Sequence, residues 1–578
     1  MSGRHRPHHG PVPGRIRLPV LVAGGAVAAA GGILLVQNLA DAGGCSMAGG
    51  VELRVAADPA VAPALREAAA EWTDHDEPEV NGACVAVVVT EAPTADVASR
   101  LSSAAGGVLD VAAGQSPPPS PAAADLPAVW IPDSSYWVTR LLTISRSFFE
   151  PDLPSLASSP IVLGVSDAGR EVLGEGPVDP TALREPLLAA LAQPDQPPPL
   201  PLMVAEPRRD TAGLVGAFWL QQAVVTEDRD LPNIVAVFRS QGEAPPDTTA
   251  LLPAFSDGLA AAPMSEQAVV AYNAANPDDT ISAVRVADAP ALDFPYVTLD
   301  RLPQDVRTAA DMFLDALGGA AETFTEHGFR APDGTAGPAF PVGDGVTAEP
   351  APAAVVGPPD RFDQTRRIWT SATSDARVLN IVNVDATMQE PMTMPDGTEV
   401  TRLQAFQAAA TDGLAMFTEG TDLGHWEYAV GLDGDRDWVE GVPIDLLTDE
   451  HTQRILGAIQ GLQTTATNES AMFETLLAAY REMKEGWDPT RSNTLVLWTD
   501  GGSSKQGGLT LEQTLRELEG LTDVTRPIRV ILIGLGPDAD MEQLEALATA
   551  TGGGAFQIPD PSQIQLVFLR ALLALPPA

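Results

Sequence analysis

The sequence predicts an α/β protein with an apolar N-terminal helix, a first α/β domain, and a second domain built on a doubly wound parallel sheet. Three observations predict this class. A charge-free apolar run stands near the N-terminus. Beyond it, short apolar segments alternate with segments of helical periodicity, which is typical of parallel sheets covered by helices. A proline-rich stretch divides this pattern in two, and 578 residues are too many for one core.

The apolar run near the N-terminus is long enough to cross a bilayer. Leu18 to Val36 carries no charge, and at about 1.5 Å per helical residue it matches a hydrocarbon core of roughly 30 Å. Arginines precede the run and Asp41 follows it, which places residues 1–17 in the cytoplasm. We therefore expect a single-pass transmembrane helix at residues 18–39 in the cell membrane, with the bulk of the chain extracellular. The alternative is a cleaved signal peptide, because Ala40-Asp41-Ala42 satisfies a small-x-small cleavage rule.

The chain has two cysteines, Cys45 and Cys84, both on the outer side of this helix. An oxidising exterior favours a disulfide bond between them. The alternative is lipid attachment at Cys45, after Ala42-Gly43-Gly44, which would leave Cys84 unpaired.

Charge and motif content exclude several classes of function. The net charge of −43 repels nucleic acid and anionic membrane surfaces. No serine lies in a Gly-x-Ser-x-Gly elbow, and the four histidines beyond the N-terminal tail form no pair at helical metal-ligand spacing. Because the sequence contains no set of nucleophile and base, we expect a protein that is not an enzyme.

The first domain is expected at residues 45–342. Strands separated by helices at this spacing predict a parallel sheet. The expected strands are 51–57, 84–90 and 108–112, and the expected helices are 60–73 and 96–105. Further along, several turns carry hydroxyls beside strands or at helix starts, where caps and turns are the commoner role. These hydroxyls belong to Ser134, Ser158, Ser159, Thr211 and Ser265.

In combination and order, these segments resemble bacterial extracellular solute-binding proteins of the two-lobed periplasmic type, in the style of molybdate- or sulfate-binding members. The resemblance is carried by VWIPDSSYWV, SLASSPIVLGV, RRDTAGL and MSEQAVVAYN. It implies two α/β lobes with a cleft, and it places the five hydroxyls near that cleft as ligand-binding residues. Arg208 and Arg209 would supply charge for an oxyanion. Such a fold is also compatible with an empty cleft that is used for protein contacts.

Residues 343–363 contain several prolines among small residues and predict a linker. The second domain follows at 364–578. Its expected strands are 378–384, 426–432, 494–498, 528–535 and 555–559, and its expected helices are 402–417, 469–483, 511–521, 541–549 and a last one through Leu573. Regular alternation of this kind predicts a doubly wound sheet.

Two strands of this second domain are followed by a carboxylate. Asp385 ends the first, with Thr387 shortly after it, and Asp500 precedes Gly501 after the third. Because parallel strands bring their carboxyl ends to one edge, where such sheets bind ligands, these oxygens predict a divalent-cation site.

The second domain resembles the von Willebrand factor A domain over nearly all its length. The resemblance is carried by VLNIVNVDATMQ, LVLWTDGGSS and VILIGLGPDADMEQLEALATATGGGAF. The family's metal-ion-dependent adhesion site uses an Asp-x-Ser-x-Ser loop, a distant Thr and a distant Asp. The matching positions are Asp385, Thr387, Gln389, Ser470 and Asp500.

These positions imply Mg²⁺ (or Mn²⁺ or Ca²⁺), with a carboxylate of a protein partner completing the metal shell. Gln389 departs from the pattern, because the second hydroxyl is lost. The alternative is a domain that keeps the fold without the ion. We expect a membrane-anchored extracellular protein that recognises a protein partner through this domain. The alternative function is binding or sensing of a small solute, an oxyanion or another molecule, in the cleft of the first domain.

Overall fold

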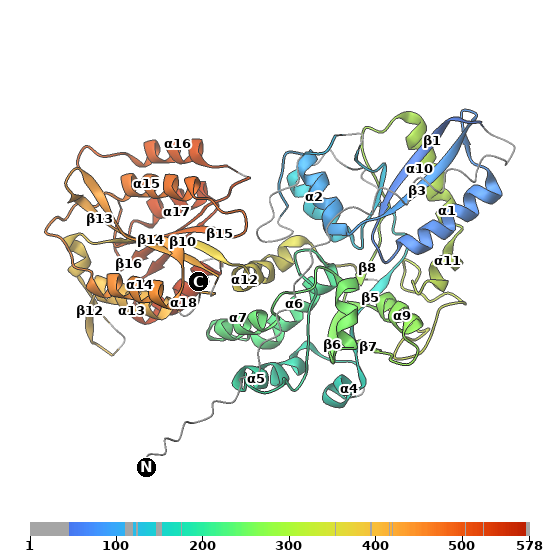
Figure 1. Ribbon diagram of the computed structural model, residues 1–578, viewed down its shortest axis with the longest axis horizontal. Helices are drawn as coiled ribbons and strands as arrows, with labels where there is room; N and C mark the ends of the chain where they lie inside the picture. The colour runs from blue at the N-terminus through green and yellow to red at the C-terminus, as the bar shows by residue number, and fades with distance from the viewer. Residues whose placement is uncertain are drawn as a thin grey trace, which may run out of the picture.

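A computed structural model describes the chain from residue 46 to residue 573, with short gaps (Figure 1). The described ranges are 46–109, 120–122, 125–145, 149, 153–174, 176–352, 354–393, 396–414, 417–418, 420–502, 504–523 and 525–573. The expected tail, the helix at 18–39 and Cys45 lie outside them. Within these ranges, no helix has the length and apolar character needed to span a membrane.

The first lobe is built on a five-stranded sheet in the order β2-β3-β1-β4-β9. Its central strand β1 is parallel to β3, as expected, and also to β4, which the sequence did not predict, whereas β2 and β9 pair antiparallel at the edges. Residues 108 and 109 of the strand expected at 108–112 are not in a strand, and residues 110–112 lie outside the described ranges. Helix α1 buries Leu65, Ala68, Ala69 and Trp72 on one face, at the spacing of an amphipathic helix. The strands are β1 (Ser46–Ala57), β2 (Glu79–Val80), β3 (Ala83–Glu91), β4 (Val129–Ile131) and β9 (Val297–Thr298), and the helices are α1 (Ala62–Asp76), α2 (Thr94–Ala104), α3 (Ser135–Ile144), α10 (Gln304–Leu317) and α11 (Ala321–Glu326).

The second lobe has its own sheet, in which β5 pairs with β6, β7 and β8. All three pairings are antiparallel, so the expectation of a parallel sheet is wrong for this lobe. The strands are β5 (Ser159–Val165), β6 (Ala261–Ser265), β7 (Ser282–Arg285) and β8 (Ala291–Leu292), and the helices are α4 (Asp167–Leu173), α5 (Arg184–Ala192), α6 (Thr211–Val224), α7 (Leu231–Ser240), α8 (Thr248–Leu251) and α9 (Glu266–Ala275).

The segment expected to be a linker packs against the first domain. Val346, Val356 and Phe362 are each at least nine-tenths buried. The Arg330 side chain, which is fully buried with its ion-pair partner Glu266, donates hydrogen bonds to the carbonyls of residues 347 and 349 at 2.7 and 2.8 Å. The proline-rich segment is therefore not a detached linker, because the apolar residues between its prolines pack on the core of the first domain.

Helix α12 (Asp363–Thr373), which the sequence assigns to the second domain, also packs on the first. Ile368, Trp369 and Ala372 join the same apolar core as helices α6 and α7. The Trp369 indole donates a hydrogen bond to Glu206 at 3.1 Å. Figure 1 shows α12 between the two domains, so the structural boundary falls after α12.

The second domain is a six-stranded sheet in the order β14-β13-β10-β15-β16-β17. Helices α13, α14 and α18 cover one face and α15, α16 and α17 the other (Figure 1). Alternate residues of β10 explain the two layers, since Val378 and Val382 pack on the first face and Leu379 and Ile381 on the second. The sheet is parallel except for β14, an unexpected edge strand that forms a hairpin with β13.

The strands of this domain are β10 (Ala376–Asn383), β13 (Asp422–Asp433), β14 (Arg436–Leu446), β15 (Ser492–Thr499), β16 (Arg529–Leu535) and β17 (Gly554–Ile558), with a small hairpin of β11 (Pro391–Thr393) and β12 (Glu399–Thr401). The helices are α13 (Arg402–Gly413), α14 (Asp449–Gly461), α15 (Met472–Glu485), α16 (Leu511–Leu521), α17 (Met541–Ala550) and α18 (Ile564–Leu572).

Candidate functional site at the strand ends of the second domain

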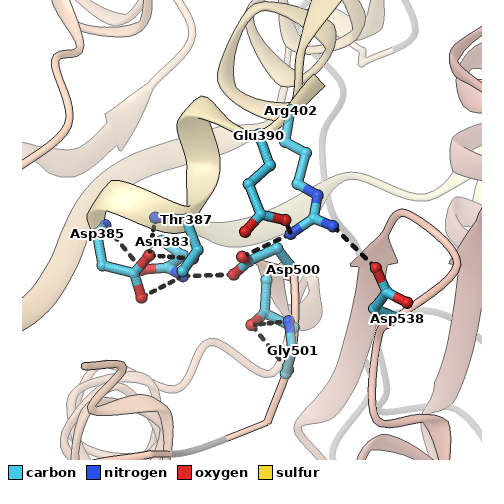
Figure 2. Close-up of polar contacts among 9 residues, drawn as sticks. Asn383, Asp385, Thr387, Glu390, Arg402, Asp500, Gly501 and Asp538 are labelled. Atoms are coloured by element: carbon cyan, nitrogen blue, oxygen red, sulfur yellow. Dashed lines mark hydrogen bonds and ion pairs between the residues drawn. The ribbon is translucent and has the colours of Figure 1, made fainter. Parts of the chain in front are cut away.

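The structure brings Asp385 and Asp500 together at one edge of the second sheet. Strands β10 and β15 are parallel neighbours, so their carboxyl ends lie side by side. The Asn383 side-chain amide donates to both carboxylates, at 3.0 Å to Asp385 Oδ2 and 2.8 Å to Asp500 Oδ1 (Figure 2). The two acids are therefore joined through an amide that the sequence analysis did not single out.

Asp385 is held by its own loop. Its Oδ1 caps a short 3₁₀ helix (Ala386–Gln389) by accepting the Thr387 backbone N–H at 2.9 Å and the Thr387 hydroxyl. Asp385 is almost fully buried, and burial raises its pKa, an effect to which the Asp500 charge adds. The hydroxyl expected to face a metal thus donates to Asp385.

Arg402, the first residue of α13, lies beside Asp500. Its Nη1 is 2.9 Å from Asp500 Oδ2 and 3.0 Å from Glu390 Oε2, and its Nη2 is 3.5 Å from Asp538 Oδ2 (Figure 2). Only 6% of the Arg402 side chain is exposed. Gly536, at φ +93°, makes room for it, because a Cβ there would lie 3.1 Å from the Arg402 Nε and Nη2.

The remaining expected ligands have other contacts. Gln389 is exposed, and its amide donates to Thr464 Oγ1 at 2.9 Å. Ser470 is buried, and its backbone N–H donates to Ser504 Oγ at 2.8 Å.

These residues fit a divalent ion poorly. Mg²⁺ requires near-octahedral oxygen ligands at about 2.0–2.1 Å. All four carboxylate oxygens of Asp385 and Asp500 already accept hydrogen bonds from Thr387, Asn383 or Arg402. An entering ion would have to displace these donors, including a buried guanidinium of the same charge sign.

The five hydroxyls expected at the cleft of the first domain are all buried. Four of them accept hydrogen bonds from the protein. The acceptor and donor pairs are Ser134 with the Tyr136 N–H, Ser159 with the Gln267 N–H, Ser265 with the Ala268 N–H, and Thr211 with the Trp137 indole. The fifth, on Ser158, has no hydrogen-bond partner within the described ranges. These residues mainly fix the ends of strands and helices.

The arginines expected to attract an oxyanion are paired with acids. Arg208 contacts Glu206 at 2.7 Å. Arg209 contacts Asp96 of α2 at 2.6 Å, which joins the two lobes. The predicted positive charge beside Thr211 is therefore already neutralised within the protein.

Acids gather around Asp133, which follows strand β4. Burial, together with the charges of Asp58, Asp210 and Asp293, raises the pKa of Asp133 well above its usual value. One oxygen of Asp133, Oδ1, is buried and has no hydrogen-bond partner among the residues described. Asp58 and Asp133 follow the parallel strands β1 and β4, the same strand-end pattern that identified Asp385 and Asp500.

Comparison with known proteins gives the class of each domain. Residues 53–330 match the family model for bacterial extracellular solute-binding proteins, and residues 433–570 match that for the von Willebrand factor type A domain. The two resemblances seen in the sequence are thus confirmed. Both families typically consist of binding domains. The second match includes Ser470 and Asp500 and begins after Asp385.

Solved structures similar to this chain come from both classes. A von Willebrand factor type A protein from Catenulispora acidiphila is 17% identical over 35% of this chain, with a TM-score of 0.28, and the chain spans 42% of that protein. The sulfate-binding protein SubI from Mycobacterium tuberculosis H37Rv is 13% identical, with a TM-score of 0.36, covering 53% of this chain and 93% of that one. A periplasmic thiamin binding protein is 11% identical, with a TM-score of 0.39, covering 57% and 97%. These similarities carry no functional conclusion, and no curated protein matches the sequence.

Proposed function

We propose that this protein recognises a protein partner through the edge of the second domain where Asp385 and Asp500 meet. The supporting observation is the set of buried hydrogen bonds and ion pairs around Asn383 and Arg402, which positions charged side chains at the exposed edge of the second sheet. Glu390 and Asp538, both held by Arg402, have side chains 55% and 80% exposed. Charges fixed before binding favour specific association, because less freedom is lost when the partner docks.

The proposal assigns the positive charge of this site to Arg402. The Mg²⁺, Mn²⁺ or Ca²⁺ implied by the family resemblance stays a prediction, and the poor fit of the donors argues against it. Partner binding at this edge should therefore persist in the presence of a chelator.

Photo-crosslinking tests the proposed surface. A crosslinking residue at Gln389, which is exposed at the rim, should capture a partner from envelope extract, with and without chelator. The same group at Glu519, exposed on the outer helix α16, is the control position. The double variant Glu390→Lys/Asp538→Lys should abolish capture, whereas Glu512→Lys/Glu519→Lys makes an equal change of charge and should preserve it. Equal capture by both double variants would contradict the proposal.

We also propose that residues 18–39 anchor the chain in the cell membrane. The first domain matches an extracellular family, which favours a location outside the cytoplasm. Protease added to intact cells should then digest the two domains, and deletion of residues 1–44 should release them from the membrane fraction. Retention of the shortened chain in that fraction would contradict the anchor.

A second candidate function is binding of a small cationic solute in the cleft of the first domain. The unpartnered Asp133 oxygen among four acids favours it. A ligand that binds only the folded state raises stability. Small amines should therefore raise the melting temperature, and the shift should disappear in Asp133→Asn, whereas sulfate and molybdate should have no effect. A shift with oxyanions alone would restore the sequence-based expectation.

A further inference from the structure

A cavity of about 470 Å³ lies in the second lobe of the first domain. Its walls are helix α6, the 3₁₀ helix Pro180–Leu183 before α5, the turn between β7 and β8, and the 3₁₀ helix Pro359–Phe362 before α12. The described residues that line it include none of the five hydroxyls expected at the cleft and none of the acids around Asp133. This cavity is therefore a different site from the ones discussed above.

The buried part of the lining is apolar and aromatic. Val215 and Trp219 of α6 and Phe362 are each at least nine-tenths buried. Phe218 of α6 packs edge to face on Phe362, with the ring centroids 5.3 Å apart. Cavities of about 300–1,000 Å³ with apolar walls and a few polar groups are typical of small-molecule sites. The buried part of this cavity thus suits an apolar or aromatic group of a ligand.

Three charged side chains line the exposed part of the cavity, those of Asp179, Asp288 and Arg361. The two acids lie on neighbouring segments, because Val178 and Val286 form a parallel bridge just before them. Negative and positive charges therefore line the same cavity.

Arg361 and Asp288 are not paired with each other or with another charge in the described part of the chain. Neither side chain forms an ion pair or a hydrogen bond there. The Arg361 guanidinium instead lies over the rings of Phe218 and Phe362, at 5.2 and 5.8 Å from their centroids. This stacking positions the guanidinium at the cavity and leaves its N–H donors available. A ligand that carries both signs of charge could therefore contact both side chains.

We propose that this cavity binds a zwitterion of the α-amino acid type that has an apolar or aromatic side chain. The ammonium group of the ligand would face Asp179 and Asp288, and its carboxylate would face Arg361. Its side chain would lie against Phe218 and Phe362. A zwitterion also suits a chain of net charge −43, which repels free anions.

The site shares no residue with the partner-binding edge of the second domain or with the solute site proposed at Asp133. Each of the three proposals can therefore fail without the others.

NMR titration of the full chain, observed on the ligand, tests the proposal with L-phenylalanine. Phenethylamine lacks the carboxylate and hydrocinnamate lacks the ammonium group, whereas both keep the ring. L-Phenylalanine should bind about fivefold more tightly than either analogue, which is the upper end of what one exposed charge pair contributes. The same ratios should be found in Asp133→Asn, which removes the other amine site proposed for this domain.

Two charge variants test the two contacts separately. Arg361→Gln should lower the preference over phenethylamine and keep the preference over hydrocinnamate, and Asp288→Asn should do the reverse. Asparagine tolerates the left-handed backbone of Asp288, which has φ +54°, so this variant keeps the turn. The matched controls are Arg516→Gln and Asp278→Asn, both exposed and outside the lining, which should keep both preferences.

A third variant blocks the cavity without changing its charge. Ala287 is exposed and lines the cavity, so Ala287→Phe fills part of the space and should weaken all three ligands. Equal affinity of the parent for the three ligands would overturn the proposal. It would also be overturned by L-phenylalanine binding that survives Ala287→Phe, by charge variants that keep both preferences, or by no binding at millimolar concentrations.

Discussion

Replacing Arg402 by glutamine should destabilise the second domain strongly. The guanidinium and the Asp500 carboxylate have side chains only 6% and 7% exposed, at 2.9 Å from each other. Removing one partner of a buried ion pair leaves the other charge uncompensated and costs about 3–5 kcal/mol. Glu390 and Asp538 are largely exposed, so their contacts contribute only about 0–1 kcal/mol each. The expected loss comes almost entirely from Asp500.

Urea unfolding of the full chain in chelator, followed at the transition of the second domain, measures this loss. The matched control is Arg516→Gln, which removes an exposed helix pair with Glu512 worth about 0.3–0.5 kcal/mol. The double variant Arg402→Gln/Asp500→Asn should be more stable than the sum of the single changes predicts, because it removes both charges. Divalent ions should stabilise Arg402→Gln but not the parent. The reasoning is refuted if Arg402→Gln costs no more than Arg516→Gln.

Three further predictions concern buried titratable groups. Burial raises the pKa of Asp58 to about 6, so folding favours its protonated form. This preference stabilises the first domain by about 3 kcal/mol below about pH 4. The stabilisation is lost as the pH rises through about 6. Unfolding of the first domain against pH should show this loss, and Asp58→Asn should show less of it. Burial lowers the pKa of His425 to about 4, so folding favours its neutral form. The resulting stabilisation of the second domain is complete above about pH 6.5 and disappears as the pH falls through about 4. The variant His425→Gln should therefore lose less stability than the parent when the pH is lowered. The variant Glu266→Gln leaves the buried Arg330 charge unpaired, so it should lower the free energy of unfolding by about 3–5 kcal/mol. It should also expose residues 343–363 to protease. The control is Glu322→Gln on the exposed side of α11, which should leave the stability almost unchanged.

The positions of Asp385 and Asp500 could be predicted from the sequence because the signal is local. Each acid directly follows an apolar strand, and parallel pairing then brings the two strand ends to one edge. Arg402 could not be predicted in this way. In the sequence it is only the first residue of a helical pattern, and its role depends on Gly536 and Asp500, both distant along the chain, which leave a guanidinium-sized space beside the carboxylate.

The domain boundary and the second lobe show a different limit. Proline content predicts irregular backbone, which most of the described residues from 343 to 358 have, but it does not predict whether Val356 and Phe362 pack on a neighbouring core. Likewise, alternating strands and helices predict an α/β domain without fixing strand direction, and in the second lobe β5 pairs antiparallel with all its partners.

The packing of α12 has a mechanical consequence. Only Ser374 and Asp375 separate the end of this helix, seated in one domain, from β10, a central strand of the other. Two residues span about 7 Å at full extension, so the connection has almost no slack. A tilt of the first domain would therefore move the beginning of β10, and the other end of this strand leads to Asp385. The short connection thus couples the orientation of the first domain to the edge of the second sheet that carries Asp385.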